Sequence, residues 1–148
     1  RDAQLSRGLG DVYKGQVLCI KSGENRNFAI LDAAMNDLIR PAMYEAYHDI
    51  VPIEQQNASR AEKVYDVVGP VCETGDTFAK ERRMNELFEN DLVAFRSAGA
   101  YGAVMSSEYN TRPLIPEVMV HKDKFSIIRK RPSYKEIIDR DIIPEWLK

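Results

Sequence analysis

Short apolar runs, each bounded by turn residues and spaced about ten residues apart, constrain this chain more than any other feature. The first two runs, at residues 17–21 and 27–32, flank a Ser-Gly-Glu-Asn segment, and this pattern predicts a β-hairpin. Alternating and β-branched residues predict further strands, at residues 48–54, 63–68, 92–99, 101–105, 117–120 and 125–129. We therefore expect a mainly β fold, an antiparallel Greek-key-like barrel or sandwich with short helices.

Three segments break the strand pattern. Residues 33–47 are rich in Ala, Met and Leu, and Pro41 limits any helix there to a short turn on either side. Residues 81–89 fit either a turn of helix or an irregular loop. Residues 134–139 place two isoleucines in a polar frame, which predicts a closing amphipathic helix.

Residues 1–15 differ from the rest of the chain. They carry three glycines and little periodicity, and the segment SRGLGDVYKGQ resembles the translated read-through of a sequencing-library adapter with one residue altered. We interpret this stretch as non-native or disordered and place the folded domain at residues 16–148. On this interpretation the native chain is truncated at its N-terminus.

The composition limits the classes of partner. The 148 residues have a net charge of −2, which argues against a general attraction to nucleic acid or to an anionic membrane. No apolar run approaches the roughly 20 residues that span a bilayer, and no signal peptide opens the chain. With two cysteines and two histidines a zinc site is poorly supplied with ligands, so we expect no metal and free thiols in a reducing cytoplasm.

Four segments carry side chains that suit chemistry, and one of them is a polar loop at residues 106–113. Cys72 and Glu73 place a thiol beside a carboxylate in a glycine-punctuated loop, where both can face something polar. Arg40 and Tyr44 can share a helical face at four-residue spacing. Small residues bracket Tyr101, so that backbone or a ligand can approach closely.

Each of these residues also has a structural explanation. Arg40 has two acidic neighbours, Asp37 and Glu45, with which it could pair on the surface. The two tyrosines could be core aromatics whose hydroxyls are hydrogen-bonded, the thiol could be inert packing, and its neighbouring carboxylate could be a solvated charge. Taken singly, none of these residues decides between a structural and a functional role.

Longer strings of residues are more specific than single side chains. The strings NFAILDAAMNDLIRPAMYEAYHDI, VGPVCETGDTFAKER, NDLVAFRSAGAYGAVMSSEYNTRP and PEVMV occur in this order. Together they make the chain resemble the C-terminal domain of the diaminopimelate decarboxylase family, over about residues 16–148 and without a large gap.

This resemblance implies an enzyme of lysine biosynthesis that uses pyridoxal 5′-phosphate to convert meso-2,6-diaminopimelate to L-lysine and CO2. Such enzymes are homodimers whose active sites lie at the subunit interface. Their N-terminal α/β barrel carries the Schiff-base lysine and the phosphate-binding loops, and neither motif is found in this sequence. We therefore expect this chain alone to be catalytically inert.

The same resemblance implies roles for the five candidate residues. Cys72 would donate a proton, and Glu73 would bind the distal amino group of the substrate. Arg40 and Tyr44 would hold the distal carboxylate, and Tyr101 would contact both cofactor and substrate. The chemistry fits, because diaminopimelate keeps a complete amino-acid head at the end that is not decarboxylated, and a selective site needs one cation and one anion there.

Two other classes of protein stay open. An ornithine, arginine or carboxynorspermidine decarboxylase, or an alanine racemase, would be a relative with another substrate, although an ornithine-type site has no distal carboxylate for Arg40 to bind. A non-catalytic β domain that binds a partner would keep the sequence without the chemistry. Turnover of diaminopimelate against ornithine tests the first alternative, and the upstream reading frame tests the second.

Overall fold

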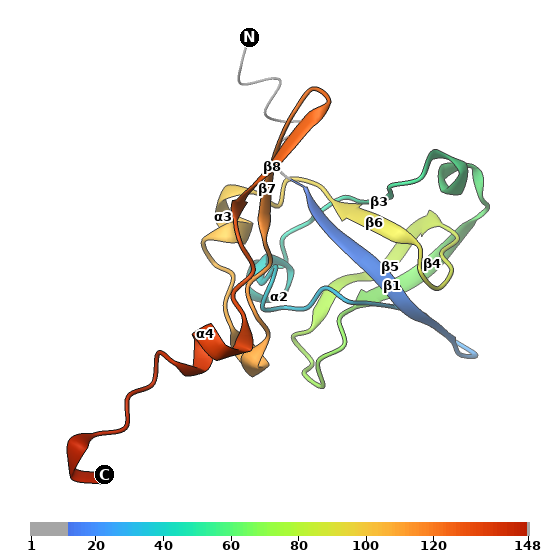
Figure 1. Cartoon of the computed structure of the whole chain (residues 1–148). Coiled ribbons are helices and arrows are strands. Elements are labelled where there is room, and N and C mark those ends of the chain that lie inside the picture. The colour runs from blue at the N-terminus through green and yellow to red at the C-terminus, as the bar shows by residue number, and fades with distance from the viewer. Residues whose placement is uncertain (1–11, 148) are drawn as a thin grey trace. The chain divides into compact units, whose positions relative to one another are not determined.

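The computed structural model describes residues 12–147, which fall into two compact units (Figure 1). The first unit ends at Ser106, and the second begins at Ser107. Residues 1–11, most of the stretch that we interpret as non-native, lie outside the described residues.

Six strands of the first unit form one sheet in the order β3-β6-β1-β2-β4-β5. The strands are β1 (Tyr13–Ser22), β2 (Asn27–Leu31), β3 (Ile50–Pro52), β4 (Glu62–Val68), β5 (Thr77–Asn85) and β6 (Leu92–Phe95). Arg82 of β5 donates a hydrogen bond to the carbonyl oxygen of His48, just before β3, over 2.9 Å, so the two edges of the sheet approach each other. The sheet is thus a nearly closed barrel, and the expected mainly β, barrel-like fold is confirmed.

Strand directions follow the prediction with one exception. Neighbouring strands run antiparallel, but β2 and β4 are parallel, with Phe28 opposite Asp66 and Ile30 opposite Val68. A parallel pair needs a long crossover, and here the crossover contains α2 (Arg40–Tyr44), β3 and the 3-10 turn η1 (Gln55–Ser59). This connection is the segment that carries Arg40.

The first hairpin forms as the sequence predicts. β1 and β2 pair antiparallel from Ser22 opposite Asn27 to Val17 opposite Leu31. β1, the long blue strand in Figure 1, begins at Tyr13, three residues before the start that we placed at residue 16. Its first residues pair with β6, a partner so distant in sequence that local patterns do not reveal it. The non-native origin of residues 1–15 stays a prediction.

The hydrophobic core receives side chains from all six strands. Its buried members are Val17, Ala29, Leu31, Ala33, Leu38, Ile50, Tyr65, Val67, Phe78, Ala79, Met84, Leu87, Val93 and Phe95. The rings of Phe78 and Phe95 lie 4.8 Å apart. The buried hydroxyl of Tyr65 accepts a hydrogen bond from the backbone N–H of Leu87 over 3.2 Å, so this aromatic enters the core without losing its polar partner.

Two segments differ from the sequence prediction. β5 continues through residues 81–85, where we expected a helical turn or a loop. Glu81 has a φ of 49°, and its N–H donates to the buried carboxylate of Asp66 over 2.7 Å, which keeps the strand paired past this irregular residue. A short helix, α3 (Ala100–Ala103), replaces the extended segment expected at residues 101–105. Both outcomes depend on contacts with segments distant in sequence.

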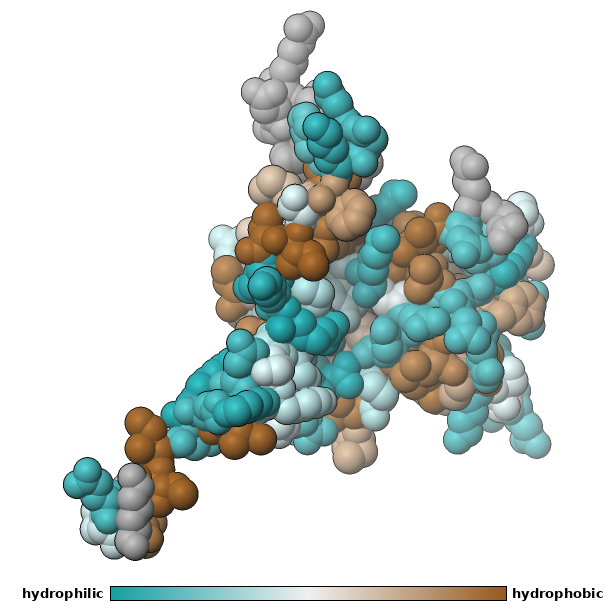
Figure 2. Space-filling view, viewed as in Figure 1, coloured by the Kyte–Doolittle hydropathy of each residue, from teal (hydrophilic) through white to brown (hydrophobic). Residues whose placement is uncertain are grey.

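The second unit contains η2 (Tyr109–Thr111), β7 (Glu117–His121), β8 (Lys124–Arg129), α4 (Tyr134–Ile138) and η3 (Glu145–Leu147). The hairpin of β7 and β8 and the closing helix confirm the prediction. Ser133 and Glu136 form a reciprocal capping box at the start of α4. Exposed apolar side chains are frequent in this unit, and they include Ile142 and Trp146. Figure 2 shows hydrophobic surface near the C-terminal end of the chain. This unit therefore buries little of its own apolar surface.

Candidate active site

α2 carries two of the predicted site residues on one short helix. Pro41 lies in its first turn, where the fixed φ of proline suits a helix and its missing N–H is not needed. The helix ends at Glu45, which has a left-handed φ of 54°. Arg40 and Tyr44 share a face, with the guanidinium carbon 5.8 Å from the centre of the Tyr44 ring. The prediction from their four-residue spacing is confirmed.

The guanidinium of Arg40 faces a second ring, that of Tyr101, at 5.5 Å. Arg40 is half-buried, whereas the side chains of Tyr44 and Tyr101 are 59% and 68% exposed, so neither tyrosine is the core aromatic that we considered. Among residues 12–147 no carboxylate forms an ion pair with Arg40. The guanidinium of Arg40 therefore lies near two aromatic rings, and no carboxylate of residues 12–147 neutralises its charge.

Asp37, the acidic neighbour that we considered as a partner for Arg40, is engaged elsewhere. It is buried, and one of its carboxylate oxygens accepts hydrogen bonds from the N–H of Ala34 over 3.0 Å and from the hydroxyl of Tyr13 over 3.3 Å. These bonds shape the turn between β2 and α2. A surface ion pair with Asp37 or Glu45 therefore does not explain Arg40.

α3 brings Tyr101 to Arg40. Its buried Gly102 packs on Leu38, just before α2, and a Cβ at this glycine would lie 3.3 Å from Leu38 Cδ1. The small residues beside Tyr101 thus permit a close approach of backbone, as the sequence predicted. Without that approach Tyr101 could not share the face of α2.

The loop between β4 and β5 is built around one buried carboxylate, that of Asp76. The N–H of Gly69 donates to the backbone carbonyl of Asp76 over 2.9 Å, and the N–H of Val71 donates to its Oδ2 over 2.6 Å. The N–H of Met35, in the segment before α2, donates to its Oδ1 over 2.7 Å. Asp76 therefore closes its own loop and joins that loop to the segment that leads into Arg40.

Cys72 and Glu73 lie on the outer part of this loop. Cys72 is an exposed free thiol, so it is not inert packing. Glu73 is exposed, and its Oε1 accepts a hydrogen bond from the hydroxyl of Thr74 over 3.2 Å. No Lys, Arg or His among the described residues pairs with Glu73, which leaves its carboxylate available to a cation.

The structure thus brings three of the five predicted site residues into direct contact, namely Arg40, Tyr44 and Tyr101. The other two, Cys72 and Glu73, lie on a separate loop, which is joined to the segment before α2 by the hydrogen bond from the N–H of Met35 to Asp76. The bonds that Asp76 makes were not predicted from the sequence. In the sequence, Asp76 is only an acidic residue seven positions after Gly69. This spacing does not reveal the hydrogen bond to Met35, because Met35 is 41 positions away.

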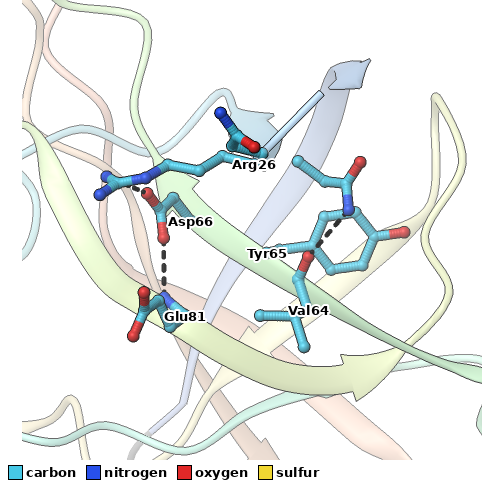
Figure 3. A pocket seen from close by; sticks show the side chains of 7 residues that line it. Arg26, Val64, Tyr65, Asp66 and Glu81 are labelled. Carbon is cyan, nitrogen blue, oxygen red and sulfur yellow. Dashed lines mark hydrogen bonds and ion pairs between the residues drawn. The ribbon is translucent and has the colours of Figure 1, made fainter. Parts of the chain in front are cut away.

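The hollow drawn in Figure 3 lies apart from these residues. It has a volume of about 320 Å³ and is lined by Asn25, Arg26, Asn27, Val64, Tyr65, Asp66 and Glu81. Asp66 accepts hydrogen bonds from the guanidinium of Arg26 over 3.2 Å and from the N–H of Glu81. The polar groups that line this hollow therefore stabilise the irregular pairing of β4 and β5.

Other kinds of site find little support in this part of the chain. Within residues 12–147 no group of three or more His, Cys, Asp or Glu side chains could hold a metal ion. No helix in that range has the length and apolar character needed to cross a membrane. Every lysine there is exposed.

The fold and these residues together define a barrel-like β domain that carries a half-buried arginine between two aromatic rings and, on a separate loop, an exposed thiol beside an exposed carboxylate. The model of the family described as pyridoxal-dependent decarboxylase, C-terminal sheet domain, matches residues 12–99, and the chain belongs to that family.

Relatives within this family are similar over most of the chain. The diaminopimelate decarboxylase of Zymomonas mobilis subsp. mobilis is 48% identical over 136 residues, which cover 92% of this chain and 32% of that protein. The crystal structure of diaminopimelate decarboxylase from M. jannaschii has a TM-score of 0.84 at 34% identity, covering 93% of this chain and 31% of that one. The Helicobacter pylori diaminopimelate decarboxylase complexed with L-lysine has a TM-score of 0.79 at 40% identity, covering 87% of this chain and 31% of that one. The chain thus spans about a third of the length of these relatives.

Proposed function

We propose that this chain is the C-terminal domain of a pyridoxal-phosphate-dependent decarboxylase that converts meso-2,6-diaminopimelate to L-lysine and CO2. The observation that carries the proposal is the guanidinium of Arg40, which faces Tyr44 and Tyr101 and has no carboxylate partner among the described residues. Diaminopimelate supplies that partner, because one of its two amino-acid heads stays intact through the reaction. The similar proteins named above support the same substrate.

The binding roles follow from charge and geometry. The planar fork of Arg40 can donate two parallel hydrogen bonds to the distal carboxylate, and the exposed hydroxyl of Tyr44 on the same helical face can donate a third. Glu73, which has no cationic partner among residues 12–147, accepts hydrogen bonds from the distal ammonium. A substrate with an amine but no carboxylate at this end, such as ornithine, would leave Arg40 unpaired.

Cys72 is the proton donor in this proposal. Loss of CO2 breaks the bond between Cα and the carboxyl carbon, and Cα must then receive a proton. The exposed Sγ–H of Cys72 delivers that proton to Cα, and solvent returns a proton to the sulfur. A thiol suits this task because its S–H group can transfer a proton to carbon in the transition state.

The residues present fit one edge of a pyridoxal phosphate site. When bound, this cofactor draws electrons away from Cα and so makes decarboxylation possible. Tyr101, with its exposed ring, would contact both the cofactor and the substrate. The exposed lysines of residues 12–147 offer no buried amine at the site, so the Schiff-base lysine would come from the rest of the protein. We accordingly expect the isolated chain to show no visible absorbance from bound cofactor.

We further propose a homodimer with shared active sites in the cytoplasm. The site on this chain supplies groups for one end of the substrate, and its aromatic rings are more than half exposed, so other protein surfaces are needed to complete it. Cys72 must remain a free thiol to donate a proton, which suits a reducing compartment.

Substrate choice tests the proposal. The full-length protein, with the residues that its reading frame encodes before this chain, should release CO2 from meso-diaminopimelate and not from ornithine. The opposite preference would refute the proposed substrate.

A further inference from the structure

We infer that Asp76 is a positioning residue, which fixes the Cys72–Glu73 loop to the segment before α2 and so sets where the thiol and carboxylate stand relative to Arg40. The inference rests on the proposed function, since it assumes that both segments serve one ligand. Asp76 itself does not touch that ligand, because its side chain is 2% exposed.

The bonds of Asp76 join two segments that are distant in sequence. Oδ1 accepts the N–H of Met35, 41 positions away, and Oδ2 accepts the N–H of Val71 within the loop. Met35 lies five residues before Arg40, and Val71 is next to Cys72. One carboxylate therefore holds the residue next to Cys72 and the segment that leads into Arg40. A buried charge-assisted bond of this kind is costly to lose.

Gly69 is matched to this carboxylate. A Cβ built on Gly69 would overlap the carboxylate of Asp76, and the backbone of Gly69 is not in the left-handed region. Glycine is therefore needed here because Asp76 occupies the space, and any larger residue would displace the carboxylate from its two N–H donors. We therefore predict that substitutions at Gly69 and at Asp76 disrupt the same hydrogen bonds, those from the N–H groups of Met35 and Val71 to the carboxylate of Asp76.

Four variants of the chain test the bridge itself. Asp76→Ala should speed hydrogen exchange at the amides of both Met35 and Val71, and Gly69→Ala should do the same. The double variant should be no worse than Asp76→Ala alone, because the atoms with which the new methyl group clashes are then absent. Gly15→Ala is the matched control, since a Cβ there meets its neighbours at 3.5 Å or more, in ordinary contact.

Ligand preference in the full-length protein tests the positioning role. L-Lysine, the product in our proposal, keeps the amino-acid head that Arg40 and Glu73 would bind, whereas cadaverine lacks its carboxylate. The ratio of the two inhibition constants therefore reports how well the head is held. We expect Asp76→Ala and Gly69→Ala each to reduce the preference for lysine about tenfold, the effect of one weakened charged contact.

Asp66→Ala separates positioning from loss of stability. Asp66 is also a buried carboxylate of the same hairpin, with an arginine and a backbone N–H as partners, but it lies away from the site. It should destabilise the protein and leave the lysine preference within about twofold.

Two results would overturn the inference. Asp76→Ala could keep the lysine preference within twofold despite faster exchange, or Asp66→Ala could reduce it as much. A wild-type full-length protein that neither turns over diaminopimelate nor binds lysine would refute the proposed function instead. In that case amide hydrogen exchange tests the inference. The inference fails unless Asp76→Ala speeds exchange at the amides of both Met35 and Val71.

Discussion

Replacing Arg40 by alanine in the full-length protein should remove most of the activity on diaminopimelate. The guanidinium can donate two charge-assisted hydrogen bonds to the distal carboxylate, each worth at least about 1.5 kcal/mol. Their loss raises the barrier by about 3 kcal/mol, which lowers kcat/KM about 150-fold. The contacts of Arg40 with two exposed tyrosine rings, at 5.5 and 5.8 Å, contribute less to folding, so the melting temperature should change little.

Two further variants sharpen the result. Arg40→Lys keeps the charge and loses the planar fork, so it should recover only part of the activity. Arg83→Ala removes an arginine whose side chain is 72% exposed and whose pair with Glu62 is 3.7 Å long, and it should stay within twofold of the wild type. The assay is CO2 release from diaminopimelate at several substrate concentrations. An Arg40→Ala protein with unchanged kcat/KM would refute the assignment of the distal carboxylate to this residue.

Three other variants test separate parts of the molecule. Cys72→Ala in the full-length protein should lower kcat at least about a hundredfold while the stability of this exposed position is unaffected, and a variant as fast as the wild type would exclude the thiol as the proton donor. Phe95→Ala should lower the free energy of unfolding by about 3–5 kcal/mol in urea titrations, because its side chain is fully buried, and a loss below about 1 kcal/mol would contradict the described core. The backbone N–H of Ser133 and, less strongly, its hydroxyl lower the pKa of Glu136. Ser133→Ala removes only the hydroxyl, so it should raise that pKa part of the way toward the ordinary value in a carbon-13 NMR titration. Because a lowered carboxyl pKa adds stability that is lost as the pH falls through it, Ser133→Ala should also reduce the loss of stability on acidification, and an unchanged titration would contradict this cap.

Local signals explain the parts of the fold that could be predicted. The first hairpin and α4 depend on neighbouring residues, such as the turn after Ser22 and the capping pair Ser133 and Glu136. Local sequence does not predict that β5 continues past Glu81, because the strand is stabilised there by the buried carboxylate of Asp66, which lies on another strand. α3 likewise depends on the contact of Gly102 with Leu38.

The candidate site shows the same division. The pairing of Arg40 with Tyr44 follows from their spacing on one helix, and the thiol beside the carboxylate at Cys72 is visible in the sequence. The approach of Tyr101 to Arg40 and the bridge through Asp76 join residues tens of positions apart, so no local pattern contains them. The fold supplies these contacts.

A crystal structure of the full-length protein with L-lysine would test the central proposal most directly. We predict that the guanidinium of Arg40 donates two hydrogen bonds to the lysine carboxylate, that Glu73 accepts from the neighbouring ammonium, and that Cys72 lies near the other end of the ligand. A lysine carboxylate bound by another residue, with Arg40 still unpaired, would contradict the proposal.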